Sequence, residues 1–311
     1  MITEKNIYFL VVVFMLTLVA CCQADTHKGG EEQMQQEIQY WSNAADEMLP
    51  TELSISNQGM ATLKLRTMRN TTNATNASVV GLFQMQLDEL RLQSLNQALN
   101  TKEFVALSNP TTFIEGEVLR KLTCKKLGQP EMVKIASGSA ARAPAFLQAE
   151  NAAKALLSDV QKHPLYALSI EVPGPSPQLH KGEPLDITVV IANRGYKSVR
   201  IPSPDAWHEK MVSMTLEALR SDVPANDLKP FHQKFEMITK ADLKQANHTD
   251  IADKFITLPP GGKSEFILSK RLTWEAGSYN LRISVQLPLE NMEGQEVLRC
   301  ELLSDIFNLL T

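Results

Sequence analysis

The sequence has little of what nucleic-acid binding requires. Aromatic residues make up only 6% of the 311 residues, and 31 lysines and arginines stand against 35 aspartates and glutamates, for a formal charge of −4. A basic surface is needed to hold phosphates, and aromatic platforms are needed to stack single-stranded bases. We therefore expect no nucleic-acid partner.

Cysteine is equally scarce. Four cysteines in a chain of this length exclude a small scaffold held together by disulfides. Cys124 and Cys300 fall in different predicted domains, which favours two separate buried thiols. A disulfide between them remains an alternative in an oxidising compartment.

Signatures of catalysis, metal binding and cofactor binding are also missing. No two of the six histidines have the i, i+4 spacing of a zinc-binding helix, and the sequence contains no Gly-x-Ser-x-Gly or Gly-x-Gly-x-x-Gly motif. The run 261–264, Gly-Gly-Lys-Ser, imitates the end of a phosphate loop but follows two prolines, so a hairpin turn explains it better. We expect no catalytic residue, no metal and no cofactor, and predict that the protein is not an enzyme.

The N-terminus carries the clearest signal. After Lys5, residues 7–20 form a mostly apolar run of 14 residues. A membrane-spanning helix needs about 20 residues, whereas the apolar region of a secretory signal peptide has roughly 7–15. The run therefore favours secretion.

The end of this run, Leu18-Val19-Ala20-Cys21, resembles the lipobox of bacterial lipoproteins. The resemblance implies a signal peptide over residues 1–20, a Cys21 that carries palmitate-type acyl chains, and a tether over 21–32. It implies that membrane lipid is a partner and that the protein faces the periplasm or the cell surface. Cys22, rather than Asp, follows Cys21, which favours the outer membrane. The alternatives are a signal peptide cut after Ala20 or Ala24, an uncleaved anchor, or a lipid site shifted to Cys22.

Residues 33–164 are predicted to form an α+β domain, with helices on one face of an antiparallel sheet. An apolar stripe at Met34, Ile38, Trp41, Ala45 and Met48 predicts a helix over 33–49. Alternation and turn residues then predict strands, a hairpin over 117–136 and two helices, one capped by Asp88 and one beginning at Pro144.

Residues 165–311 are predicted to form an all-β, immunoglobulin-like sandwich. Strict alternation over 279–287 places Tyr279 and Ile283 in the core and Ser284 outside, and the Tyr279 hydroxyl should find a backbone partner. Three segments, Lys181–Gly195, Leu258–Gly262 and Trp274–Tyr279, resemble bacterial surface adhesion domains and proteinase-inhibitor-type sandwiches. The stretch from about 205 to 250 fits this resemblance poorly and predicts a long insertion or irregular strands.

These observations predict an envelope-anchored, non-enzymatic lipoprotein with a binding or structural role and a possible protein partner in the envelope. One alternative is a periplasmic protease inhibitor, which requires an exposed, rigid loop with an apolar tip. Another alternative is an enzyme with a site between the two domains, which requires a deep pocket lined by several ionisable groups.

Overall fold

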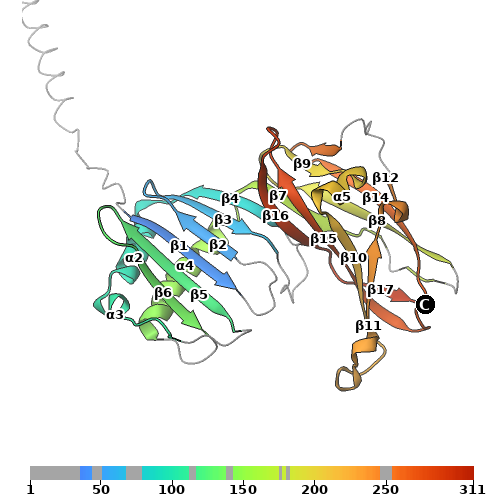
Figure 1. Ribbon diagram of the computed structural model, residues 1–311, viewed down its shortest axis with the longest axis horizontal. Coiled ribbons are helices and arrows are strands. Elements are labelled where there is room, and N and C mark those ends of the chain that lie inside the picture. Colours follow the sequence, from blue (N-terminus) through green and yellow to red (C-terminus); the bar gives the residue numbers. More distant parts are fainter. Residues whose placement is uncertain are drawn as a thin grey trace, which may run out of the picture.

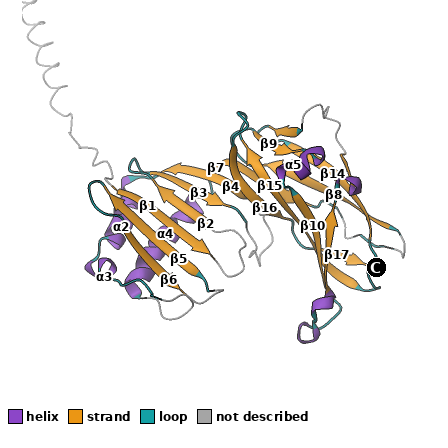
Figure 2. Ribbon diagram, in the orientation of Figure 1, coloured by secondary structure: helices purple, strands orange, loops and turns teal. Residues whose placement is uncertain are grey.

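The chain folds mainly into antiparallel β-structure, as the computed structural model in Figures 1 and 2 shows. The structure describes residues 36–43, 51–67, 79–111, 117–137, 143–174, 177–179, 183–245 and 254–311. Two sheets account for the described strands, and helices are few.

The first sheet has ten strands in the order β12-β14-β8-β7-β4-β3-β2-β1-β5-β6. Its strands are β1 (Gln36–Asn43), β2 (Thr51–Ile55), β3 (Met60–Leu65), β4 (Val80–Gln86), β5 (Leu119–Lys126), β6 (Met132–Ser137), β7 (Pro164–Glu171), β8 (Pro184–Asn193), β12 (Leu243–Gln245) and β14 (Lys263–Arg271).

The second sheet is built around the long strand β15 (Ser278–Glu290), which pairs with β10 on one side and with β16 and β17 on the other. The remaining strands are β9 (Val199–Pro202), β10 (Ser213–Arg220), β11 (Gln233–Ile238), β13 (Phe255–Leu258), β16 (Glu296–Leu303) and β17 (Phe307–Leu310). Strand β11 pairs only with β10 and lies at an edge of this sheet among the described strands.

The two faces of the first sheet are covered by different elements in its two halves. Helices α2 (Glu89–Leu99), α3 (Lys102–Val105) and α4 (Pro144–Val160) pack on one face of the half formed by β1 to β6. The second sheet packs on the half formed by β7, β8, β12 and β14 and makes a β-sandwich with it. Where β4 pairs with β7, Val80 lies opposite Leu168 and belongs to the core of the sandwich. Ala167, the residue next to Leu168, belongs to the core beneath the helices. The helices and the second sheet therefore cover opposite faces.

Most of the predicted elements of the first half are confirmed. Asp88 caps α2 by accepting a hydrogen bond from the Arg91 N–H, and the predicted stripe buries Leu95 and Leu99. Pro144 occupies the first turn of α4, and the hairpin is formed by β5 and β6. Whether residues 33–164 fold as a separate α+β domain remains a prediction, because β4 pairs with β7 and the sheet continues across the predicted boundary at residue 165.

The predicted helix over 33–49 is wrong. Gln36–Asn43 is strand β1, in which Gln36, Ile38 and Tyr40 are buried on one face. The buried glutamine hid the two-residue alternation, and Trp41, which the helical spacing grouped with Ile38, lies on the opposite face of the strand.

Residues 205–245, the described part of the stretch from about 205 to 250, are more regular than predicted. Strands β10 and β11 pair antiparallel over six residues, and short 3₁₀ turns separate them from their neighbours. Within β11, the apolar residues Phe235 and Met237 face outward, whereas the half-exposed charged residues Lys234 and Glu236 lie on the opposite face.

Ile283 of β15 is buried, as the alternation predicted. Ser284 is also buried, although it was predicted to be exposed to solvent. Glu301 of β16 covers it and accepts a hydrogen bond from the Ser284 hydroxyl at 2.9 Å and one from Thr67 at 3.1 Å. The Glu301 N–H donates to the Arg66 carbonyl at 2.7 Å. The outer face of this strand is therefore closed, at this position, by the end of the first half of the chain.

The lipobox with Cys21 and Cys22 and the tether lie outside the described residues. In the part of the chain that the structure describes, no helix has both the length and the apolar character that a membrane span requires.

Candidate binding face on the second sheet

The outer face of β11, β10, β15 and β17, which points away from the sandwich core, carries large exposed apolar side chains. Phe235 and Met237 of β11 are 66% and 58% exposed, and Ile306, at the start of β17, is 55% exposed. Register places Phe235 beside Glu217 and Glu217 beside Arg282 across the sheet. We call this surface, made of the outward residues of these four strands, the outer face.

A surface cavity of about 220 Å³ opens on the outer face. Apolar side chains line it from both sides, with Phe235 on β11 and Ile306 beside β17, and the charged side chains Glu217 and Arg282 lie between them. The Nε atom of Arg282 is buried and has no hydrogen-bond partner within the described residues. Because this Nε is covered, an incoming group would meet the positive charge of Arg282 rather than this donor, and a negative charge would be favoured beside it.

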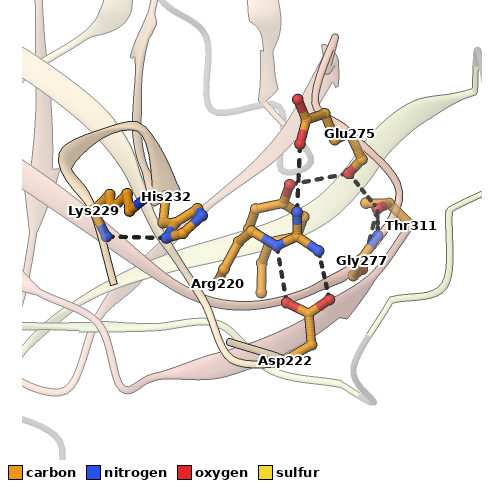
Figure 3. A network of polar contacts seen from close by, with 8 residues as sticks. Arg220, Asp222, Lys229, His232, Glu275, Gly277 and Thr311 are labelled. Carbon is orange, nitrogen blue, oxygen red and sulfur yellow. Dashed lines mark hydrogen bonds and ion pairs between the residues drawn. The ribbon is translucent and has the colours of Figure 1, made fainter. Parts of the chain in front are cut away.

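A polar network at one end of β10 holds the rim of the outer face in place (Figure 3). Arg220 makes a bidentate ion pair with Asp222, from Nε to Oδ1 at 2.9 Å and from Nη2 to Oδ2 at 2.6 Å, and its Nη1 lies 3.4 Å from Glu275. Thr311 ties the C-terminus to the same place, because its hydroxyl bonds to the Glu275 and Gly277 backbone.

The Trp274–Tyr279 segment, one of the three on which the predicted resemblance depends, forms this end of the sheet. The Tyr279 hydroxyl donates to the Glu275 carbonyl at 3.0 Å, which confirms the predicted backbone partner. Trp274 donates to Glu236 of β11 at 3.0 Å. A Cβ on Gly277 would lie 2.7 Å from the Arg220 guanidinium and 2.9 Å from the Asp222 carboxylate, so the ion pair packs directly against this glycine.

The ion pair shifts the titration of both partners. Hydrogen bonding from Arg220 lowers the pKa of Asp222 to about 2, and the same hydrogen bond raises the pKa of the Arg220 guanidinium. Burial raises the pKa of the Tyr279 phenol. Each shift favours the form that the network already contains, so the groups hold structure rather than exchange protons near neutral pH.

The other two singled-out segments also meet in space. The Asn193 side chain accepts from the Gly195 N–H at 2.8 Å and donates to the Leu258 carbonyl at 2.9 Å, and the Asn193 and Gly262 backbones bond at 2.9 Å. These residues fasten turns at one end of the sandwich. Their pattern in the sequence therefore reflects folding rather than binding.

Three glutamates, Glu150, Glu290 and Glu301, are buried in the described structure, and each has partners that hold the packing together. The Lys210 ammonium donates to Glu290 at 2.9 Å. Glu150 of α4 accepts from Arg120 at 2.9 Å, from Lys154 at 2.7 Å and from Tyr40 at 3.2 Å. Burial is the main cause that raises the pKa of Tyr40. Glu301 joins β16 to the end of the first half, as described above.

Cys124 and Cys300 are unpaired and buried in two different cores, as the sequence favoured. Burial raises the pKa of Cys124 to about 11 and that of Cys300 to about 12. Both thiols are therefore protonated and packed as small apolar groups.

Sequence reasoning missed the residues of the outer face. The one predicted modification site, Cys21, lies outside the described residues. Within the described ranges, no group of three or more His, Cys, Asp or Glu side chains is arranged to hold a metal. The signal that could have found the face is the alternation Phe235, Met237 in a segment whose intervening residues are charged.

Comparison with known proteins places the chain in no family. No protein-family model and no curated protein matches it. Among solved structures, the PapD-like domain 7 of human CEP192 is 14% identical and is matched over 44% of this chain and 83% of its own, with a TM-score of 0.23. AggA, the major subunit of aggregative adherence fimbriae type I from Escherichia coli, is 8% identical over 47% of this chain and 93% of its own, with a TM-score of 0.21. MyfA, the major subunit of Myf fimbriae from Yersinia enterocolitica, is 12% identical over 46% of this chain and 98% of its own, also with a TM-score of 0.21. At these TM-scores, the similarities do not identify a function.

Proposed function

We propose that the protein is a non-enzymatic binding protein of a bacterial envelope, held at a membrane through lipid on Cys21, and that it docks a protein partner on the outer face. The proposal includes an α+β first domain and an immunoglobulin-like class for the sandwich. The lipobox resemblance supports the location, and the outer face supports the binding role.

The observation that carries the binding role is the cluster of exposed apolar side chains around the cavity. Single exposed apolar residues are ordinary, but Phe235, Met237 and Ile306 share one face of adjoining strands. Burying them against a partner removes apolar area from water, which stabilises association by about 25 cal/mol per Å² before the costs of binding.

Arg282 defines the chemistry of that partner. Its guanidinium lines the cavity between Phe235 and Ile306, and its Nε lacks an acceptor. A carboxylate on the partner would be attracted by the positive charge of Arg282, provided that it approaches on the side away from Glu217. The face therefore fits a protein surface on which an acidic side chain lies next to apolar ones.

A second candidate function, protease inhibition, rests on the connection between β10 and β11. Phe231 is 59% exposed in the 3₁₀ turn Pro230–His232, and the His232 Nδ1 accepts from the Lys229 N–H at 3.0 Å, which stiffens the turn. This is the apolar-tipped, rigid loop that an inhibitor requires. Incubation of the purified protein with a panel of serine, cysteine and metalloproteases tests it: the Phe231→Gly variant should lose any inhibition seen with the original chain.

Site-specific photocrosslinking in the source cells tests the docking proposal. A benzoylphenylalanine at Ile306 should give a discrete crosslinked product, and the additional change Phe235→Asp or Arg282→Glu should abolish it. Leu127, which is 83% exposed at the turn between β5 and β6, is the matched control position. No product at Ile306, or the same product at Leu127, would overturn the proposal.

A further inference from the structure

Strand β11 has a free edge whose sequence is complementary to itself. Within the described strands it pairs only with β10, so the backbone groups on its other side have no strand partner. Edge strands of this kind are templates for pairing with another chain unless something blocks them.

Two existing contacts show which residues point their backbone groups toward this edge. The Gln233 N–H donates to the Pro230 carbonyl, and the Met237 carbonyl accepts from the Lys270 ammonium at 2.8 Å. Neither partner belongs to β10. Because the backbone groups of alternate residues point to the same side of a strand, the N–H and C=O of Phe235 also face the free edge.

The charges on β11 select one pairing. If a second copy pairs antiparallel about a two-fold axis through Phe235, then Lys234 of each copy lies opposite Glu236 of the other. The two Phe235 side chains lie opposite each other on the outer face. Gln233 lies opposite Met237 of the other copy, so the two groups that are already occupied, the Gln233 N–H and the Met237 carbonyl, face each other and mark the ends of the pairing.

We propose that the protein forms a symmetric dimer by antiparallel pairing of β11 with β11 of a second copy, centred on Phe235. Two opposite-charge pairs and one aromatic pair accompany the backbone hydrogen bonds, and cross-strand pairs of these kinds are favourable. The dimer joins the two sheets, so the outer faces of both copies become one continuous surface with two cavities. This inference stands on β11 and does not require that the outer face binds another protein.

Disulfide trapping of the full-length protein tests the register. In the proposed pairing, the Cα atoms of Phe235 in the two copies are about 5.5 Å apart, within the range that a disulfide spans. Phe235→Cys should therefore form a covalent dimer rapidly under mild oxidation. The matched control is Met237→Cys, on the same strand and face, whose copies would lie about 14 Å apart and should not crosslink above the background of the native cysteines.

A double variant keeps the test independent of Phe235 itself. Gln233→Cys together with Met237→Cys places cysteines opposite each other at both ends of the pairing and should restore rapid crosslinking, whereas Gln233→Cys alone should not crosslink. If Phe235→Cys crosslinks no faster than Met237→Cys, or if the double variant stays monomeric, the proposed pairing is wrong.

Charge reversal provides a readout without a covalent bond. Lys234→Glu replaces both attractive pairs by repulsive ones and should weaken dimerisation about tenfold in sedimentation equilibrium. Glu236→Lys should do the same alone, and an equimolar mixture of the two variants should form a heterodimer as tightly as the original chain. A mixture that stays monomeric at concentrations where the original chain is dimeric would also overturn the proposal. Photocrosslinking at Ile306 reports on the other partner and can fail without affecting any of these results.

Discussion

Two exposed sheet faces of this molecule have contrasting chemistry. The open face of β1 to β4, opposite the helices, satisfies its own polar groups: Glu52 pairs with Lys64 at 3.7 Å and with Arg66 at 3.4 Å, and Gln84 donates to Thr62 at 3.2 Å. The outer face of the second sheet presents Phe235, Met237 and Ile306, and no acceptor in the described part of the chain reaches the Nε of Arg282.

This difference shows that strand alternation alone does not distinguish a solvated face from a binding face. Both faces lie on antiparallel sheets with one side packed on a core. The open face of the first sheet needs only water, because its cross-strand pairs complete one another. The outer face of the second sheet gains from a partner that removes its apolar side chains from water and places a negative charge beside Arg282. Each prediction below tests what supports one of these two faces or what covers it.

The largest expected effect is at the joint between the two regions. Gly81 of β4 has φ of +150°, and a Cβ on it would lie 2.1 Å from the Tyr166 carbonyl of β7. Gly81→Ala should push the two strands apart and lower the free energy of unfolding by about 4 kcal/mol or more. Gly128→Ala is the control, because Gly128 has φ of +73° and no neighbouring atom within 4 Å, so only about 1–2 kcal/mol of backbone strain is expected. Equal losses in urea denaturation would show that β4 and β7 are not tightly joined.

Next in size is the core beneath the outer face. Ile283 is fully buried, and Ile283→Ala should cost about 2–5 kcal/mol through lost burial and a residual cavity. Leu63→Ala, at a fully buried position of β3, is the counterpart beneath the other face and should cost a similar amount. A much smaller loss for Ile283→Ala would mean that the sheet carrying the binding face is loosely packed.

Ser284→Ala should have an intermediate effect. The substitution removes a donor from the buried Glu301 carboxylate, which should cost about 1–3 kcal/mol. The control is Thr215→Ala, because Thr215 pairs with Ser284 across β10 and β15. Equilibrium denaturation of both variants measures the difference between their free energies of unfolding. A loss below about 0.5 kcal/mol would mean that Glu301 does not depend on this hydroxyl.

The dependence of the free energy of unfolding on pH, in the acid range, tests the Arg220–Asp222 ion pair shown in Figure 3. The folded-state pKa of Asp222 is about 2, below its ordinary value of 3.8. A group whose pKa is lowered by folding stabilises the fold above its ordinary pKa, and this contribution is lost as the pH falls from about 4 toward 2. Asp222→Asn should therefore remove the pH dependence that this group adds in the window, and between pH 5 and 8 it should lower the free energy of unfolding without changing its slope with pH. If the variant and the original chain lose stability equally between about pH 4 and 2, the Arg220–Asp222 ion pair does not persist in solution.

The smallest effect on stability should come from the outer face itself. Phe235→Ser and Ile306→Ser should change the free energy of unfolding by no more than about 0.5 kcal/mol, because both side chains are already exposed. The same variants should lower the fluorescence of bound 8-anilinonaphthalene-1-sulfonate, an aromatic anion that suits a cavity lined by Phe235, Ile306 and Arg282. Leu90→Ser, at an exposed position of α2, should leave that fluorescence unchanged.

Sequence patterns predicted the elements whose signal is local. Asp88 and Pro144 mark helix starts by their own chemistry, and strict alternation identified β15. Patterns failed where a distant contact decides the environment. Gln36 is buried in β1 against its polarity, and Ser284 is covered by Glu301, a residue 17 positions away in the chain, together with Thr67 from the other half. The outer face could not be predicted for a related reason: the alternation of Phe235 and Met237 does not tell which side of β11 packs on the core.

Methionine oxidation tests the central claim, that a partner covers the outer face. Met237, Met211 and Met292 are 58%, 73% and 51% exposed, and only Met237 lies on the outer face. In the dilute purified protein, hydrogen peroxide should oxidise all three at comparable rates, as resolved by peptide mass spectrometry. In intact source cells, Met237 should be oxidised several-fold more slowly than the other two. Equal rates for Met237, Met211 and Met292 in cells would contradict the account.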